Sequence, residues 1–206
     1  MIRTKKELSF YIKADYMMNR GYFSPSWKRR LFTMIFPDYI MNYLCVMRKY
    51  HYYKMLDGGW NKILSLWYKM RFRKLGIKLG YSIHEDVMGY GVVLCHHGTI
   101  VIGGENHIGN YCVLHTSTCI AQIGKEIGNG LYLSTGVKIT KPLKLGDNVS
   151  IGANSLVNHS YPEGNVMIAG SPAKVIKSEQ AWYIRDGEPY KRRVEAVEAL
   201  RKALGL

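Results

Sequence analysis

The sequence is poor in cysteine and proline and lacks any long apolar run. Only four of the 206 residues are cysteine and six are proline. The cysteines show neither metal-site nor disulfide spacing, so we expect free thiols in a reducing compartment. No stretch approaches about 18 uncharged apolar residues, the length that a transmembrane helix needs. The apolar segment Leu8 to Ile12 is too short for a secretory signal. These absences predict a cytoplasmic protein.

Acidic residues are scarce in the first part of the chain. Residues 1–80 hold 17 Lys and Arg against 4 Asp and Glu, whereas residues 81–206 hold 12 against 11. Nine of the sixteen tyrosines also lie in residues 1–80. This basic, aromatic surface is either an ordinary solvated helical face or a peripheral contact with an anionic membrane or a lipid-linked glycan. No nucleic-acid-binding motif accompanies it, so no nucleic-acid partner is expected.

Residues 1–80 show helical rather than strand-like patterns. The segments Tyr39 to Arg48 and Ile63 to Met70 are typical of helices. Pro25, Pro37 and the pair Gly58-Gly59 interrupt the helical pattern. We expect three or four short helices.

From Ile102 onward, aliphatic residues recur every six positions. Ten such positions fall within 56 residues, with one slip of a single residue after Ile120. They are Ile102, Ile108, Leu114, Ile120, Ile127, Leu133, Ile139, Leu145, Ile151 and Val157. A period of six matches neither an amphipathic helix nor a half-buried strand, but it is typical of a repeat protein.

A three-sided coil explains this period. Each six-residue side is a short strand with one inward aliphatic residue, and three sides make a coil of about 18 residues. Stacked coils pair as parallel strands about 4.8 Å apart. Residues 81–176 would supply roughly five coils, giving a prism roughly 24 Å long.

Two further segments carry a family resemblance. One is Leu94-Cys95-His96-His97-Gly98-Thr99-Ile100-Val101-Ile102-Gly103, and the other is Ala169-Gly170-Ser171-Pro172-Ala173-Lys174-Val175-Ile176. Together with the repeats, they resemble the serine acetyltransferase and polysaccharide O-acetyltransferase branch of the hexapeptide-repeat acyltransferases, over about residues 81–178.

The resemblance implies a mainly β protein built on a left-handed parallel β-helix. The left-handed sense comes from the resemblance, since spacing does not give it and it departs from the usual right-handed crossover. We expect a helical domain over 1–80, the β-helix acyltransferase domain over 81–178 and a helical tail over 179–206. In the tail, Val194, Val197, Leu200 and Leu204 form one apolar stripe.

Acetyl transfer to a hydroxyl needs a base, donors for the oxyanion and a site that holds both substrates. Histidine suits the base because its ordinary pKa is about 6.5. The resemblance places His96 in that role, with His97 and His115 as candidate substrate contacts. We expect the other histidines to be ordinary surface, loop or corner residues; they are His51, His84, His107 and His159.

The sequence departs from serine acetyltransferases at two positions. Those enzymes carry an aspartate in an Asp-Ile-His segment, where this chain has Ser82-Ile83-His84. Glu85 or Asp86 is the candidate replacement that would orient His96. The second histidine of the serine enzymes falls on Gly124. Both departures favour a sugar acceptor over serine.

The resemblance also implies that acetyl-CoA lies along a prism edge, held by backbone groups at corners and by a basic residue near its phosphates. No metal site is expected, and no P-loop or dinucleotide motif occurs. The matching positions are Ser134, Thr135, Gly136, Gly152, Ala153, Ala169, Gly170, Ser171 and Lys174.

The sequence therefore predicts an acetyl-CoA-dependent O-acetyltransferase acting on a sugar hydroxyl of a cell-surface polysaccharide or its precursor. Related prisms work as homotrimers with the site between subunits, and we expect the same here. One alternative is serine O-acetyltransferase of cysteine biosynthesis. Another is an inactive β-helix that serves as a scaffold or binding module.

Overall fold

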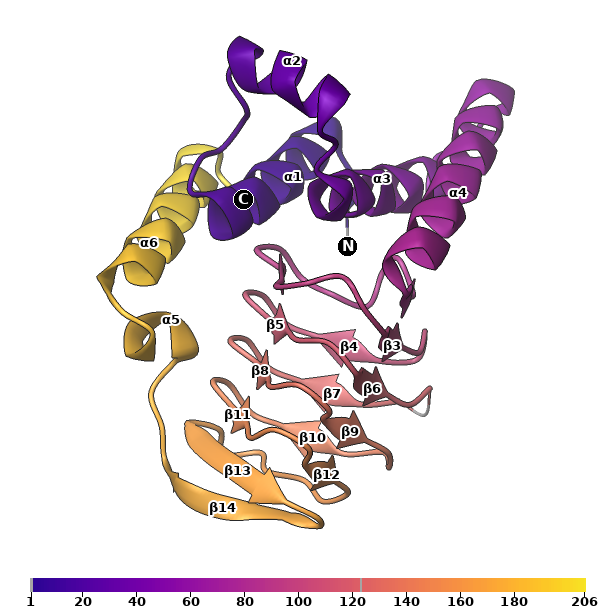
Figure 1. The fold of residues 1–206 in the computed structure, drawn as a ribbon. Helices are drawn as coiled ribbons and strands as arrows, with labels where there is room; N and C mark the ends of the chain where they lie inside the picture. Colours follow the sequence, from indigo (N-terminus) through magenta and orange to yellow (C-terminus); the bar gives the residue numbers. More distant parts are fainter. Residues whose placement is uncertain (1, 123) are drawn as a thin grey trace.

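The computed structural model describes residues 2–122 and 124–206. A layer of helices covers one end of a three-sided solenoid, and the C-terminal segment returns along one side of the solenoid to the helical layer (Figure 1). None of the described helices is long and apolar enough to cross a membrane.

Four helices form the layer over the first part of the chain: α1 (Lys5–Arg20), α2 (Trp27–Ile35), α3 (Tyr39–Lys54) and α4 (Gly59–Leu79). Three of them begin at side-chain caps, which satisfy otherwise unpaired backbone N–H groups. Thr4 and Glu7 form a reciprocal capping box at α1, while Ser26 and Asp38 cap α2 and α3. The predicted helical region is confirmed.

The solenoid consists of three sheets, one for each side of the prism. Sheet A contains β1 (Tyr81–Ile83), β3 (Ile100–Ile102), β6 (Thr118–Ile120), β9 (Lys138–Ile139) and β12 (Leu156–Val157). Sheet B contains β4 (His107–Ile108), β7 (Glu126–Ile127) and β10 (Lys144–Leu145). Sheet C contains β2 (Val93–Leu94), β5 (Val113–Leu114), β8 (Tyr132–Leu133), β11 (Ser150–Ile151), β13 (Val166–Gly170) and β14 (Ala173–Ser178).

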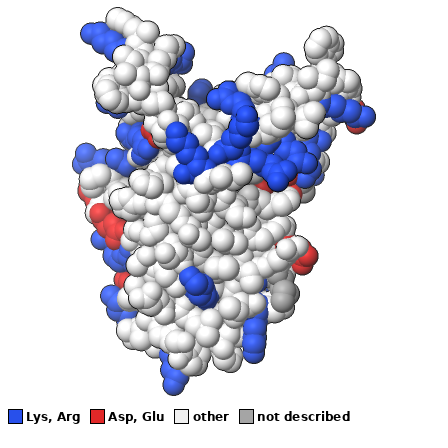
Figure 2. Space-filling model, turned by 45° about the vertical axis from the view of Figure 1, so that its right-hand side comes forward, with Lys and Arg blue, Asp and Glu red and all other residues white. Residues whose placement is uncertain are grey.

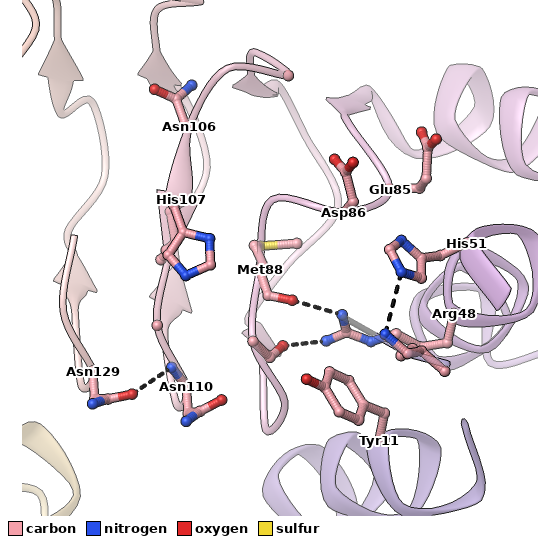
Figure 3. A pocket seen from close by; sticks show the side chains of 15 residues that line it. Tyr11, Arg48, His51, Glu85, Asp86, Met88, Asn106, His107, Asn110 and Asn129 are labelled. Atoms are coloured by element: carbon pink, nitrogen blue, oxygen red, sulfur yellow. Dashed lines mark hydrogen bonds between the residues drawn. The ribbon is translucent and has the colours of Figure 1, made fainter. Parts of the chain in front are cut away.

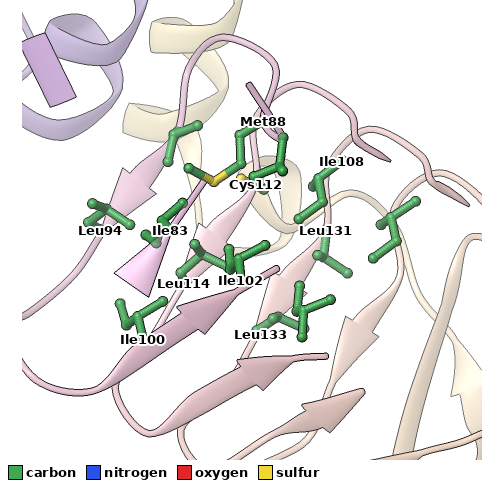
Figure 4. Close-up of a cluster of buried hydrophobic side chains, with 14 of the residues drawn as sticks. Ile83, Met88, Leu94, Ile100, Ile102, Ile108, Cys112, Leu114, Leu131 and Leu133 are labelled. Carbon is green, nitrogen blue, oxygen red and sulfur yellow. The ribbon is translucent and has the colours of Figure 1, made fainter. Parts of the chain in front are cut away.

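The strand register confirms the predicted coil. Ile100 lies opposite Thr118 and Tyr132 opposite Ser150, both in parallel and 18 residues apart. All ten aliphatic positions of the six-residue period are buried, none more than 3% exposed. They meet in one continuous core at the centre of the prism (Figure 4). Burying each such side chain contributes about 1.5–3 kcal/mol.

The far end of the solenoid closes in a way that the sequence did not predict. β13 pairs with β14 antiparallel, so the last part of the expected prism is a hairpin. After it, α5 (Trp182–Arg185) and α6 (Glu188–Ala203) pack along sheet C and against α1. Val194 and Val197 of the predicted apolar stripe are buried there, with Leu200 and Leu204 partly buried. The C-terminal helix is confirmed.

The charge difference between the two parts of the chain is visible on the surface. Lys and Arg side chains gather around the helical end of the molecule, whereas they are scattered singly over the visible face of the solenoid (Figure 2).

Candidate active site

The corners between sheets C and A stack into one edge of the prism, which we call the corner column. It comprises the corners 95–99, 115–117, 134–136 and 152–155, and residues 169–171, at the end of β13 and in the turn to β14, extend it. Backbone hydrogen bonds link successive corners: the N–H groups of Cys95, His115, Ser134 and Gly152 donate to the carbonyl groups of Leu114, Leu133, Ile151 and Ile168. Residues far apart in the sequence therefore form one continuous surface.

His96 lies at the end of the corner column nearest the helices. Its side chain is exposed, and its carbonyl oxygen accepts a hydrogen bond of 2.7 Å from the Tyr81 hydroxyl. The Tyr81 ring packs edge-on against Tyr43 of α3, with 5.1 Å between ring centroids. The Gly98 N–H donates to the carbonyl oxygen of Leu79, the last residue of α4. The helical layer thus fixes the backbone that carries His96.

His115 occupies the next corner of the column. Its Nε2 lies 3.0 Å from the Tyr132 hydroxyl and 3.6 Å from the Cys95 sulfur. Burial lowers the pKa of His115, and the nearby charge of His96 lowers that pKa further. His115 is therefore largely neutral near pH 7 and available for hydrogen bonding.

Cys95, which directly precedes His96 and contacts His115, carries a thiol that could in principle act as a nucleophile. Burial raises the pKa of the Cys95 thiol to about 11. Since the thiolate is the reactive form, a thiol that stays protonated is a poor nucleophile. The geometry therefore favours chemistry at the imidazoles over a covalent cysteine intermediate. All four cysteines are free, as predicted.

The predicted cofactor positions follow His96 and His115 down the corner column. Ser134, Thr135 and Gly136 form the third corner, and Thr135 binds the carbonyl oxygen of Thr116 in the corner before it. Gly152 and Ala153 belong to the fourth corner. A Cβ on Gly152 would lie 2.9 Å from the Cβ of Ala169, so the coils approach too closely there for a larger residue.

The lower end of the column holds the remaining cofactor positions. Ala169 and Gly170 end β13 and Ser171 follows it, and the Gly170 N–H donates to the Ser155 hydroxyl of the fourth corner. Lys174 is exposed on β14 directly opposite Ala169. The structure thus brings His96, His115 and every predicted cofactor position to one edge of the prism.

Glu85 and Asp86 do not lie near His96. They form the corner after β1, between sheets A and B, and other partners hold them there. Glu85 is buried and pairs with Lys54 of α3 at 2.6 Å, while Asp86 lies 2.5 Å from Nδ1 of His84. The prediction that either carboxylate orients His96 has no support in this arrangement. Within residues 2–122 and 124–206, the His96 ring makes no side-chain hydrogen bond or ion pair.

These two carboxylates instead line a pocket of about 430 Å³ between the first coils and the helices. Tyr11, Arg48 and His51 approach it from the helices, and His107 approaches it from β4 (Figure 3). The pocket is separate from the corner column, because it lies over sheet B.

The remaining histidines are placed mostly as expected. His97, beside His96, is exposed, as are His107 and His159, while His84 is half-buried at its corner. His51 is different: only 5% of it is exposed, and its Nε2 accepts a hydrogen bond from the Ile2 N–H. The prediction that His51 is an ordinary surface, loop or corner residue is therefore wrong, because His51 of α3 is buried against the N-terminal segment.

Sequence reasoning missed Tyr132 and Arg185 near the column. The Arg185 guanidinium lies over the Tyr132 ring, 4.5 Å from its centroid, and donates to the Ser150 hydroxyl at 3.1 Å. Tyr132 directly precedes the inward Leu133, so strand alternation could have placed its side chain outside the prism. No sequence signal brings Arg185 there, since α5 reaches sheet C through the tertiary fold alone.

The described part of the chain contains no group of three His, Cys, Asp or Glu side chains that could hold a metal ion.

Comparisons with known proteins point to one group of enzymes, although no protein-family model matches the chain. The chain is 30% identical to the serine acetyltransferase of Synechococcus elongatus over 105 residues, which are 47% of this chain and 43% of that protein. It is 27% identical to the Haemophilus influenzae serine acetyltransferase over 140 residues, which are 63% of this chain and 51% of that protein. The chain therefore spans about half the length of the curated relatives that it matches.

Solved structures agree with the sequence matches. A serine acetyltransferase in complex with CoA has a TM-score of 0.57 at 20% identity, covering 82% of this chain and 67% of that one. The Neisseria gonorrhoeae serine acetyltransferase has a TM-score of 0.58 at 18% identity, covering 84% and 66%. At this level of identity the likeness establishes the fold. The fold of this chain is the left-handed parallel β-helix that serine acetyltransferases build from hexapeptide repeats.

Proposed function

We propose that the chain is an acetyl-CoA-dependent O-acetyltransferase with His96 as the general base. The observation that carries this proposal is the exposed His96 at the head of a column of small-residue corners. The similarity to serine acetyltransferases, one of them solved with CoA, supports the same conclusion.

The proposed reaction is a direct transfer. His96 takes the proton of the acceptor hydroxyl while that oxygen attacks the thioester carbonyl carbon. The tetrahedral intermediate then loses CoA as the carbon–sulfur bond breaks, and the imidazolium of His96 returns the proton to the leaving sulfur. The raised pKa of Cys95 supports transfer without an acyl-enzyme, because the neighbouring thiol stays protonated.

Acetyl-CoA would lie along the corner column below His96. Close backbone approach requires small side chains, and Gly136, Gly152, Ala153 and Gly170 satisfy that requirement. Lys174 is exposed at the lower end, where its ammonium group could meet a phosphate.

L-Serine is the acceptor that the comparisons favour, because the curated relatives are serine acetyltransferases. This result supports the alternative named from sequence over the polysaccharide acceptor.

A sugar hydroxyl remains a second candidate acceptor for one specific reason. Ser82 stands where the resembling serine enzymes carry an aspartate, and the structure supplies no substitute carboxylate from Glu85 or Asp86. A serine-specific site built around that aspartate would be incomplete here.

We also propose that the chain acts as a homotrimer with the site between subunits. Helices α5 and α6 cover part of sheet C, whereas the outer face of sheet A carries the partly exposed residues Val101, Cys119 and Leu156, with the exposed Lys138 between Cys119 and Leu156. The apolar part of this face supports packing against a neighbouring copy.

The test is CoA release from acetyl-CoA, measured separately with L-serine and with a panel of glycans and nucleotide sugars. The active acceptor should gain the mass of one acetyl group. Activity with serine alone would establish the first candidate, and activity with a sugar alone would establish the second. Failure to bind acetyl-CoA in calorimetry would contradict the proposal and favour an inactive scaffold.

A further inference from the structure

Two helical segments extend away from the rest of the molecule. No residue of α2 is buried, and none is buried in the first part of α4, from Gly59 to Arg71. Both segments lie at the end opposite the β13–β14 hairpin, where they form two projections (Figures 1 and 2). We call the surface of these two segments the helical tip.

The helical tip exposes large apolar side chains. Trp27, Met34 and Ile35 of α2 are 68%, 77% and 74% exposed, and Trp60 at the start of α4 is 81% exposed. The remaining large apolar residues exposed there are Leu31, Phe32, Ile63, Leu64, Leu66, Trp67 and Met70. Each of the two projections therefore exposes several large apolar side chains close together, which marks an interaction site rather than ordinary single exposures.

Basic residues accompany these apolar side chains, and acidic residues are absent. Lys28, Arg29 and Arg30 lie on α2, and Lys62, Lys69 and Arg71 lie on the first part of α4. Neither α2 nor α4 contains an Asp or a Glu. In two places a basic side chain contacts an exposed aromatic ring: Lys28 lies over the Trp27 ring, and Arg71 lies over the Trp67 ring.

The combination of exposed apolar and basic side chains indicates the chemistry of the partner that the helical tip would bind. A second copy of the same surface would oppose cation to cation, which disfavours self-association through the helical tip. An anionic bilayer offers acidic head groups to the Lys and Arg side chains and an interface in which Trp, Phe and Leu side chains are stable.

We propose that the helical tip docks on an anionic lipid surface. The apolar side chains of α2 and of the first part of α4 enter the interface, and the neighbouring Lys and Arg side chains meet the head groups. This docking does not depend on the proposed reaction. If the reaction is also correct, His96 lies near the membrane, because its corner contacts the last residue of α4, roughly 12 Å along the helix axis from Arg71.

The test is co-sedimentation of the full chain with vesicles of phosphatidylcholine alone or of phosphatidylcholine mixed with phosphatidylglycerol. The wild type should bind the mixed vesicles and not the neutral ones, and added salt should weaken that binding. The double variant Phe32→Ser/Ile35→Ser should lose at least about tenfold in partitioning, since it removes two apolar side chains from the interface.

Matched controls lie elsewhere on the same chain. Val175→Ser/Ile176→Ser changes two apolar residues that are 52% and 59% exposed on β14, and it should bind like the wild type. For charge, Arg29→Gln/Arg30→Gln should weaken binding, whereas Lys191→Gln/Arg192→Gln on α6 should not.

Three results would overturn the proposal. The first is no binding of the wild type to the mixed vesicles. The second is an equal loss of binding in the β14 control and the α2 variant. The third is a smaller sedimenting mass for Phe32→Ser/Ile35→Ser than for the wild type, which would assign the surface to a second copy of the chain. Unchanged unfolding midpoints would show that all four variants are folded.

Discussion

At the residue scale, Arg48 joins the helical layer to the first coil of the solenoid. Its guanidinium pairs with Asp15 of α1 at 2.9 Å, and both side chains are almost fully buried. It also donates to the carbonyl oxygens of Met88 and Gly89, while Asp15 accepts from the Val92 N–H. A single arginine thus connects α3, α1 and the first coil.

We predict that Arg48→Met lowers the free energy of unfolding by about 3–5 kcal/mol, because Asp15 would stay buried without its partner. Chemical denaturation measures this change. Lys144→Met, which breaks the exposed pair with Glu126, is the control and should leave the denaturation midpoint unchanged. Equal free energies of unfolding for the two variants would show that the buried pair does not hold the helical layer to the solenoid.

His115 gives a pH dependence whose sign follows from its surroundings. Burial and the charge of His96 hold the pKa of His115 below its ordinary value of 6.5. As pH falls below about 6.5, the unfolded chain takes up a proton that folded His115 still resists, so the free energy of unfolding decreases. The free energy of unfolding stops decreasing for this reason once the pH is below the pKa of His115 in the folded protein, because both states then carry the proton.

We therefore expect His115→Gln to lose stability less steeply than the wild type as pH falls from about 7 toward 5. Urea denaturation over a pH series measures the two slopes. His159→Gln changes an exposed histidine and should keep the wild-type slope. Parallel slopes for wild type and His115→Gln would show that His115 is solvated like an ordinary histidine.

At the element scale, the short strands depend on corners that let the coils approach each other closely. A Cβ on Gly109, in the corner after β4, would lie 2.7 Å from the backbone of Gly128 and Asn129 in the next coil. Backbone atoms cannot swing aside as a long side chain can. Any larger residue at this corner must push two coils apart.

Gly109→Ala should accordingly lower the free energy of unfolding by about 1–3 kcal/mol through overpacking. Gly59→Ala is the matched control, because a Cβ there has nothing within 4 Å. Alanine at that helical position should be neutral or stabilising by up to about 1 kcal/mol. Thermal or chemical denaturation compares the two, and equal stability would mean that the coils have room to relax.

Helices and strands could be predicted from the sequence wherever local sequence patterns determine them. Aliphatic spacing predicted the coils, and the interruptions around Pro25, Pro37 and Gly58 separate the four helices. The hairpin of β13 and β14 was not predicted, because its apolar residues Val175 and Ile176 resemble one more coil although both are exposed.

At the scale of the whole molecule, the column of candidate site residues follows directly from the coil. Once corners repeat about every 18 residues, His96, Ser134, Gly152 and Gly170 must stack on one edge. Contacts outside the coil were not predictable. Arg185 reaches Tyr132 only because α5 folds back on sheet C. Glu85 pairs with Lys54 only because α3 lies over that corner.

The spacing of the aliphatic residues also does not predict the handedness of the solenoid. Three short sides and one inward residue per side are compatible with either sense of winding. The left-handed sense came from the resemblance, and the likeness to the solved serine acetyltransferases confirms it.

The most direct test of the account is the rate of CoA release by His96→Ala, compared with the wild type on the best acceptor. The account predicts a fall in kcat of about a hundredfold or more, because the variant lacks the general base. The variant should keep the sedimenting mass and unfolding midpoint of the wild type, since the His96 side chain is exposed. His159→Ala should retain full activity. Unchanged turnover in His96→Ala would contradict the proposed base and the site built around it.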